Sequence, residues 1–380
     1  MTSSRQSFII DAVRSPIGLK KGRLVGIRAD DLATQVVEGL LARQPAVPRE
    51  AIEDVVLGCA FPEHTQGMLM ARGVALLAGL PETTAGKVVN RFCGSSMDAV
   101  HQLSQAVLAG DLECGLAVGV EDMFAIPMGG FNPSFHPRLA DLEYYIGMGE
   151  TAEILAAELE ISREEQEGFA VRSHERALAA WDEGRFTSEV VAIRNEDETI
   201  DRDEGPRTPD LDKIRSLEPA FLAGGTITAA TSSPISLGAA ALLVASDAFA
   251  DKHGLTPRAR IVSRGVAGVD WRRMGMGPIP ASRIALERAG LEIGDVDLIE
   301  LNEAFAAQAL YVLKKTGWPL EKVNVNGGAI ALGHPLGASG ARILATLINT
   351  LEQRDARVGL ATMCIGTGQG IATVIERGSR

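Results

Sequence analysis

The feature that most limits the fold of this chain is a pattern of strand, glycine-rich turn, helix and strand that occurs twice. One copy spans residues 88–120 and the other spans 323–366. The expected strands are 87–90, 116–120, 323–326 and 358–363, the expected helices are about 96–109 and 339–351, and strand–turn–helix openings at 53–67 and 296–310 precede the two copies. A repeat of this kind predicts an α/β protein built from two similar halves.

The stretch of about 121–247, between the two copies, does not follow the pattern. Its clearest element is a helix over 162–181, because Ser162 and Glu165 form a capping-box pattern and Gly184 is a suitable stop. We therefore predict an N-terminal half (1–120), an inserted domain (121–247) that covers a site between the halves, and a C-terminal half (248–380).

Composition excludes several classes of protein. With 380 residues, 46% of them hydrophobic, the chain can bury a large core. A net charge of −12 without a basic stripe argues against binding nucleic acid or an anionic membrane surface. No apolar run reaches the roughly 18–20 residues of a membrane span, and the N-terminus has no signal-peptide pattern. We expect a cytoplasmic protein.

The four cysteines are Cys59, Cys93, Cys114 and Cys364. They form no CxxC pair and no cluster with zinc-ligand spacing, so we predict no metal site. So few cysteines in so long a chain indicate a reduced, intracellular protein. Cys59 and Cys114 lie inside apolar strand patterns and are interpreted as core residues.

Cys93 differs from these because the glycine turn NRFCGSS places it directly before a helix. Unpaired N–H groups and the helix dipole at such a position favour the thiolate, so we expect a pKa below the ordinary value of about 8.5. From the residues alone, a nucleophile and a core cysteine remain equally open.

Three further residues stand in settings suited to chemistry. His334 lies between Gly333 and Pro335 in a glycine-rich loop that enters a helix. Cys364 ends the last long strand before GTGQG, whose N–H groups suit a developing oxyanion better than a phosphate. Asn302 heads a helix, where its simplest role is an N-cap. Two cysteines and a histidine of this kind indicate covalent catalysis, with the second sulfur carrying a proton.

Six motifs occur in one order along the chain: VVNRFCGSSM (88–97), MGETAE (148–153), GPIPASRIALERAGL (277–291), NEAFAAQ (302–308), GGAIALGHPLGASGAR (327–342) and CIGTGQG (364–370). With these motifs the chain resembles the thiolase family over nearly its whole length. The resemblance implies duplicated α/β halves in a layered α-β-α-β-α arrangement, with an inserted loop domain over the substrate.

The resemblance also implies the chemistry. Cys93 is expected to attack the 3-oxo carbon of a 3-oxoacyl-CoA, with His334 as its base. Cys364 would protonate the departing acetyl-CoA enolate and then deprotonate coenzyme A, the co-substrate; no permanently bound cofactor is expected. Asn302 would hold a water that, with His334, binds one oxyanion, and the N–H groups of Cys93 and Gly366 would bind the other.

Residues that line the substrate pocket in relatives match Met148, Ser233, Met274 and Phe305. A basic contact to the CoA phosphates is expected in the inserted domain, for which Arg207, Lys213 and Arg215 are candidates. For each of these three taken individually, solvated surface is the favoured interpretation.

The chain departs from the family pattern at a few positions. Thr231 and Leu237 stand where relatives often have asparagine and aspartate, which puts local packing in doubt. Thr367 replaces a common glycine, with a small effect expected because the oxyanion donor is backbone. Gly147 stands where biosynthetic members usually have histidine, which leaves room beside the reacting carbon.

These features resemble the degradative 3-ketoacyl-CoA thiolases of fatty-acid β-oxidation. The alternatives are a biosynthetic acetoacetyl-CoA thiolase, a non-catalytic CoA- or lipid-binding subunit and, last, a generic cysteine hydrolase. The family implies a homodimer or a dimer of dimers, and the degradative branch often joins a partner with hydratase and dehydrogenase activities.

Overall fold

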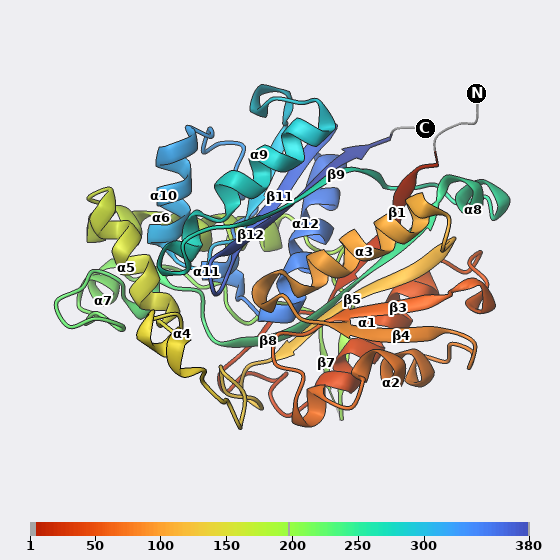
Figure 1. Ribbon diagram of the computed structural model, residues 1–380, viewed down its shortest axis with the longest axis horizontal. Coiled ribbons are helices and arrows are strands. Elements are labelled where there is room, and N and C mark those ends of the chain that lie inside the picture. Colours follow the sequence, from red (N-terminus) through yellow and green to blue (C-terminus); the bar gives the residue numbers. More distant parts are fainter. Residues whose placement is uncertain (1–4, 197, 379–380) are drawn as a thin grey trace.

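The first half of the fold is a mixed sheet. A computed structural model describes residues 5–196 and 198–378 (Figure 1). The strands of the first half lie in the order β4–β3–β5–β8–β1. Their bounds are β1 (Ser7–Arg14), β3 (Asp54–Gly58), β4 (Ala85–Val89), β5 (Cys114–Asp122) and β8 (Ser236–Ser246), and a short β2 (Gly18–Leu19) pairs with β8. The strands β3, β4 and β5 are parallel, whereas β8 is antiparallel to both β5 and β1.

The second half repeats this order as β10–β11–β12–β9. Its strands are β9 (Ala259–Gly268), β10 (Leu298–Leu301), β11 (Val358–Ile365) and β12 (Gln369–Arg377). Again β10 and β11 are parallel, and β12 is antiparallel to β11 and β9. The halves join where Phe8 and Ile9 of β1 pair with β9. The predicted duplication is therefore confirmed in strand order and direction.

The predicted strand 323–326 is wrong. Only Val323 pairs there, in a single parallel bridge to Ile299. Asn324 has a left-handed φ of 47°, so the backbone is not extended there. Its side chain makes the hydrogen bonds that the backbone of a paired strand would make. The Asn324 amide accepts the Leu301 N–H and donates to the Leu301 carbonyl, both at 2.8 Å. An asparagine side chain that mimics a backbone strand gives no periodicity by which it can be recognised.

Helices cover both outer faces and fill the middle. In the middle, α3 (Ser95–Ala109) and α12 (Ser339–Gln353) pack against each other and against strands of both halves. The outer helices of the first half are α1 (Ala29–Arg43) and α2 (Met70–Leu77), and those of the second are α9 (Pro278–Ala289) and α10 (Ala306–Thr316). Figure 1 shows these pairs at opposite ends of the molecule. This is the expected α-β-α-β-α layering.

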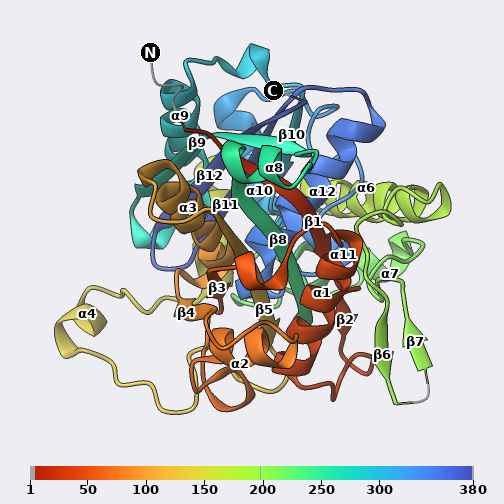
Figure 2. The same ribbon diagram turned by 90° about the vertical axis from the view of Figure 1, so that its right-hand side faces the viewer.

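The inserted segment is best defined by comparing the two halves. Between β11 and β12 the second half has only the turn 366–368, whereas 123–235 separate β5 from β8 in the first half. Its elements are α4 (Pro137–Asp141), α5 (Met148–Glu158), α6 (Arg163–Asp182), β6 (Ile193–Asn195), β7 (Glu198–Ile200) and α7 (Leu211–Arg215). Figure 2 shows α4 and the β6–β7 pair projecting from different sides of the molecule.

The predicted boundaries 121–247 of the insertion need correction. Residues 236–246 form β8, which lies in the core sheet between β5 and β1, and β5 itself extends to Asp122. Within the insertion, the predicted helix is confirmed as α6. Ser162 and Glu165 form a capping box at its start, and Gly184 follows its end with φ of 69°.

Candidate active site

Cys93 lies in a short 3-10 turn, Phe92–Gly94, between β4 and α3. The turn packs against the end of β11 and against the turn Leu336–Ala338 of the other half. Gly94 permits this approach, because a Cβ there would lie 2.6 Å from Cδ1 of Ile365. The junction between the halves therefore forms around the cysteine.

The predicted low pKa of the Cys93 thiol is wrong. Burial raises the pKa to about 11, even though the N–H groups of Gly366 and of Cys93 itself point at the sulfur and lower it; the charge of Glu121 raises it further. The turn before α3 separates Cys93 from the first residues of the helix, and desolvation outweighs two neutral donors. The resting thiol is neutral and needs a base.

His334 is a buried neutral imidazole, 4% exposed. The backbone N–H of His334 donates to Ser236 Oγ at 2.9 Å. Gly333, directly before it, has φ of 118°, a conformation that glycine adopts readily. Burial and the charge of Arg342 lower the pKa of His334 to about 3.

Ser339 determines which ring nitrogen of His334 carries the proton. Its hydroxyl donates to the Pro335 carbonyl at 2.9 Å, and its oxygen lies 2.6 Å from His334 Nδ1. A hydroxyl has one hydrogen, so with that hydrogen used, Oγ accepts from Nδ1–H. The Nε2 lone pair is then free to take a proton.

Cys364, at the end of β11, is 1% exposed. Its pKa is raised strongly by burial and by the neighbouring Cys93 sulfur. Its side chain belongs to an apolar cluster with Met274 and Phe305, against which Met148 packs. Three of the expected substrate-lining residues thus gather around this second thiol.

The insertion also contributes Met148 and Ser233, which lie next to Gly366 and Ala304 of the second half. Met148 begins α5, and its sulfur lies 3.3 Å from where a Cβ on Gly366 would stand. The Ser233 N–H and hydroxyl both donate to the Ala304 carbonyl, at 3.0 Å.

Asn302 is not an N-cap. The helix α10 begins at Ala306 with Phe305 as its N-cap. Asn302 directly follows β10, and its backbone N–H donates to the Thr362 carbonyl. Asn302 Nδ2 instead lies 3.5 Å from Nδ1 and 3.4 Å from Nε2 of His334. A side-chain amide therefore faces the imidazole.

The CoA-phosphate candidates remain surface residues. Arg207, Lys213 and Arg215 are exposed on the insertion. The Arg207 backbone N–H contacts His174 Nδ1 at 3.4 Å, and Lys213 and Arg215 form the last turn of α7. Among the contacts described, none links these three to the two thiols or to His334.

The positions that depart from the family pattern are packed within local structure. Thr231 is buried, and its hydroxyl accepts the Thr228 N–H at 3.0 Å to close a 3-10 turn. Leu237 is buried in β8 and pairs with Gly18. Thr367 has a left-handed φ of 65°.

Glu121 is a site residue that the sequence reasoning missed. Its carboxylate is 1% exposed and accepts N–H groups of Ala60 (2.7 Å) and Gly337 (2.8 Å), which joins the first half to the loop of His334. Burial raises the pKa of Glu121. The signal in the sequence was a carboxylate near the end of the apolar strand β5. Ser339 was also missed, although it stands five residues after the histidine.

Two negative findings concern the described residues. No group of three or more His, Cys, Asp or Glu side chains there is arranged to hold a metal ion. None of the helices over 5–196 and 198–378 is long and apolar enough to cross a membrane.

Known proteins are similar to this chain over nearly its whole length. The model of the thiolase N-terminal domain matches residues 7–248, and that of the thiolase C-terminal domain matches 255–377. The chain is 49% identical to a 3-ketoacyl-CoA thiolase of Shewanella frigidimarina (strain NCIMB 400) and to one of Shewanella loihica (strain ATCC BAA-1088 / PV-4), over 98% of this chain and 100% of each relative.

Two solved structures are also similar. A crystal structure of human mitochondrial 3-ketoacyl-CoA thiolase and one of the same protein in complex with CoA match with a TM-score of 0.92, at 36% and 37% identity. The match covers 99% of this chain and 99% and 98% of theirs.

Proposed function

The chain belongs to the thiolase family, and we propose that it cleaves 3-oxoacyl-CoA with coenzyme A, giving acetyl-CoA and an acyl-CoA shortened by two carbons. The observation that carries the proposal is the meeting of Cys93 from one half with Cys364, Gly366 and the His334 loop from the other. Two relatives that are 49% identical bear the name 3-ketoacyl-CoA thiolase, which supports this reaction. We propose that it serves as the thiolytic step of fatty-acid β-oxidation.

The first half-reaction breaks the C2–C3 bond. His334 Nε2 takes the proton of the neutral Cys93 thiol as the sulfur attacks the 3-oxo carbon. The tetrahedral adduct collapses to an acyl thioester on Cys93 and the enolate of acetyl-CoA. Cys364 gives its proton to C2 of the enolate, and acetyl-CoA leaves.

The second half-reaction transfers the acyl group. The Cys364 thiolate takes the thiol proton of coenzyme A, whose sulfur then attacks the acyl carbonyl. Acyl-CoA departs, and the Cys93 sulfur recovers its proton from the His334 imidazolium. Every proton is returned, so the enzyme ends as it began.

Two oxyanion sites fit these steps. The N–H groups of Cys93 and Gly366, both directed at the Cys93 sulfur, suit the oxygen on the carbon that the sulfur attacks. On the other side, Asn302 Nδ2 and His334 Nε2 suit the thioester oxygen, where the enolate charge develops. Asn302 would act there through a bound water.

A preference for chains longer than four carbons is supported by Gly147. It is the N-cap of α5, directly before Met148, and as a glycine it adds no side chain beside that residue. Turnover of 3-oxo-octanoyl-CoA and acetoacetyl-CoA, each with saturating coenzyme A, tests the proposal. We expect a larger kcat/KM for the longer substrate. An equal or larger value for acetoacetyl-CoA would favour the biosynthetic branch instead.

We further propose that the chain forms a homodimer. The proposal is supported by β4, which ends the strand order with β3 as its one partner among the described strands. Near it, Met68 and Leu69 are 100% and 54% exposed. An open edge beside apolar side chains is suited to pairing with a second copy. We also propose a cytoplasmic location, and phosphate contacts by Arg207, Lys213 and Arg215. The homodimer could pair further into a dimer of dimers or associate with a hydratase/dehydrogenase partner, and both assemblies are proposed as well.

A further inference from the structure

Arg342 is a charged side chain buried directly behind the proposed oxyanion site. It lies on α12, three residues after Ser339, and is 2% exposed. Its Nη2 lies 3.5 Å from Asn302 Oδ1, and its Nη1 lies 3.8 Å from Glu300 Oε2. Among the described residues, Arg342 Nε and Nη1 have no hydrogen-bond partner. A buried cation held this loosely needs an explanation other than stability.

The contact with Arg342 fits only one of the two orientations of the Asn302 amide. A guanidinium only donates hydrogen bonds, whereas a side-chain amide has an oxygen that accepts and a nitrogen that donates. The flipped amide would set Asn302 Nδ2 against Arg342 and leave two donors facing each other. With Oδ1 on Arg342, Asn302 Nδ2 is turned to His334, at 3.4 Å from Nε2.

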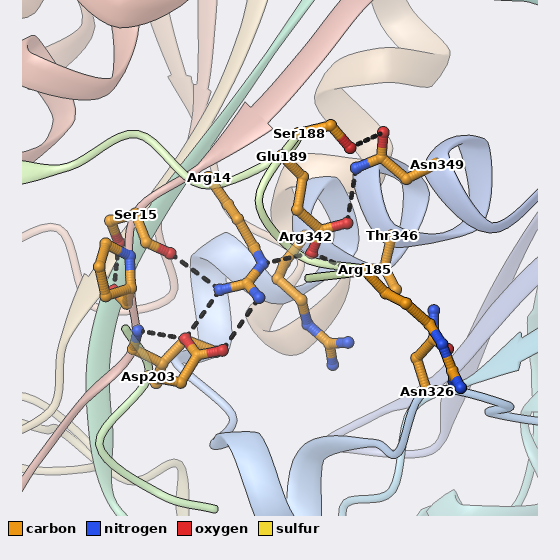
Figure 3. Close-up of polar contacts among 12 residues, drawn as sticks. Arg14, Ser15, Arg185, Ser188, Glu189, Asp203, Asn326, Arg342, Thr346 and Asn349 are labelled. Carbon is orange, nitrogen blue, oxygen red and sulfur yellow. Dashed lines mark hydrogen bonds and ion pairs between the residues drawn. The ribbon is translucent and has the colours of Figure 1, made fainter. Parts of the chain in front are cut away.

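The carboxylate of Glu189, near Arg342, is already hydrogen-bonded to other residues. The carboxylate of Glu189 already accepts from Arg14 Nε, Thr346 Oγ1 and Asn349 Nδ2, at 2.6, 2.9 and 2.7 Å. Arg14 also pairs with Asp203. Figure 3 shows the guanidinium of Arg342 pointing away from Glu189, with no bond to any residue drawn. In the described part of the chain, Glu189 thus accepts hydrogen bonds from three other residues and none from Arg342.

We propose that Arg342 is a positioning residue that keeps the Asn302 amide with its N–H group towards the enolate oxygen. The inference rests on the proposed function. It assigns Arg342 to the first half-reaction, in which the enolate forms. The second half-reaction uses the N–H groups of Cys93 and Gly366 and does not need Asn302.

The two half-reactions can be measured separately. Acylation of Cys93 by 3-oxo-octanoyl-CoA without coenzyme A reports the first. Exchange of labelled coenzyme A into hexanoyl-CoA requires only the second. In Arg342→Met, which keeps the side-chain length but removes the donors, we expect acylation to slow about 10- to 100-fold. Exchange should change less than about 3-fold, within the scatter of comparable substitutions.

Two further variants separate positioning from folding. Thr346→Val, one turn further along α12, removes a bond to Glu189 without touching Asn302 and should leave both rates within about 3-fold. In the background of Asn302→Ala, which itself should slow acylation about 100-fold, Arg342→Met should add almost nothing. Arg342→Lys, which keeps a donor, is a second probe should the methionine variant not fold, and it should retain part of the acylation rate.

Three results have distinct meanings. Equal slowing of acylation and exchange in Arg342→Met, or losses that multiply in the double variant, would overturn the positioning role. Normal acylation by Asn302→Ala would refute the oxyanion assignment on which the inference rests. Slowed acylation with normal exchange, together with no added loss in the double variant, is the result we expect.

Discussion

The Cys93 thiol should react with a small alkylating reagent at a rate that rises steadily with pH, without a plateau near neutrality. Burial holds the pKa of Cys93 at about 11, while burial and Arg342 hold the pKa of His334 at about 3. Because the acid has the higher pKa and the base the lower one, the resting pair is a neutral thiol and a neutral imidazole. It is not a thiolate–imidazolium pair.

The size of the effect follows from the pKa. A thiol with a pKa of about 11 is ionised to about one part in 10⁴ at pH 7, against about 3% for an ordinary thiol with a pKa of about 8.5. Cys93 should therefore react about 300-fold more slowly than an ordinary thiol of equal nucleophilicity at pH 7. Its rate should rise about tenfold for each pH unit up to about pH 10.

Iodoacetamide labelling across pH 5–10, followed by mass analysis of the peptide that contains Cys93, measures this profile. The other three cysteines are buried and serve as internal references. His334→Ala is the matched control, and it should leave the slope unchanged because a neutral imidazole does not stabilise the thiolate. A plateau below pH 7 that disappears in His334→Ala would show a resting ion pair and contradict the raised pKa of Cys93.

Three other perturbations test separate parts of the structure. Ser339→Ala removes the acceptor that holds the proton on His334 Nδ1, so kcat/KM should fall about 10-fold or more while the melting temperature changes little. His101 is buried with its pKa lowered to about 3, so below about pH 6.5 it gains a proton when the protein unfolds. The free energy of unfolding should therefore fall as the pH drops below about 6.5, by about 2 kcal/mol at pH 5. Urea unfolding of His101→Gln should show a smaller fall over the same pH range. Gly94→Ala places a Cβ 2.6 Å from Ile365 Cδ1, so the free energy of unfolding in urea should fall by about 1–3 kcal/mol; an unchanged value would mean that the junction of the halves yields at no cost.

Much of the fold could be predicted from the repeat, because the repeat consists of local sequence signals such as apolar runs and glycine turns. The strands before Cys93 and Cys364 and the helix stop at Gly110 follow from apolar runs and glycine. The insertion boundary was missed, although 236–246 is a continuous apolar run of the kind that marks a strand buried on both faces. The role of Asn324 could not be predicted, because its side chain replaces strand pairing with a residue 23 positions away in the sequence.

The residues of the candidate site could be predicted from the sequence, but their pKa values could not. The motifs predicted Cys93, His334 and Cys364 as site residues, and in the structure all three lie where the halves meet. The pKa of Cys93 was predicted in the wrong direction, because desolvation depends on atoms of the other half that the local sequence does not contain. Arg342 acquires its role from Asn302, 40 residues away in sequence.

In the proposed function, Cys93 captures the acyl group in a carbon–carbon cleavage. The most direct test mixes the protein with 3-oxo-octanoyl-CoA in the absence of coenzyme A and measures both the protein mass and the released acetyl-CoA. We expect a hexanoyl group on Cys93, one acetyl-CoA released for each group bound, and no adduct in Cys93→Ser. Release of acetyl-CoA without an adduct, or an adduct on another residue, would contradict the claim.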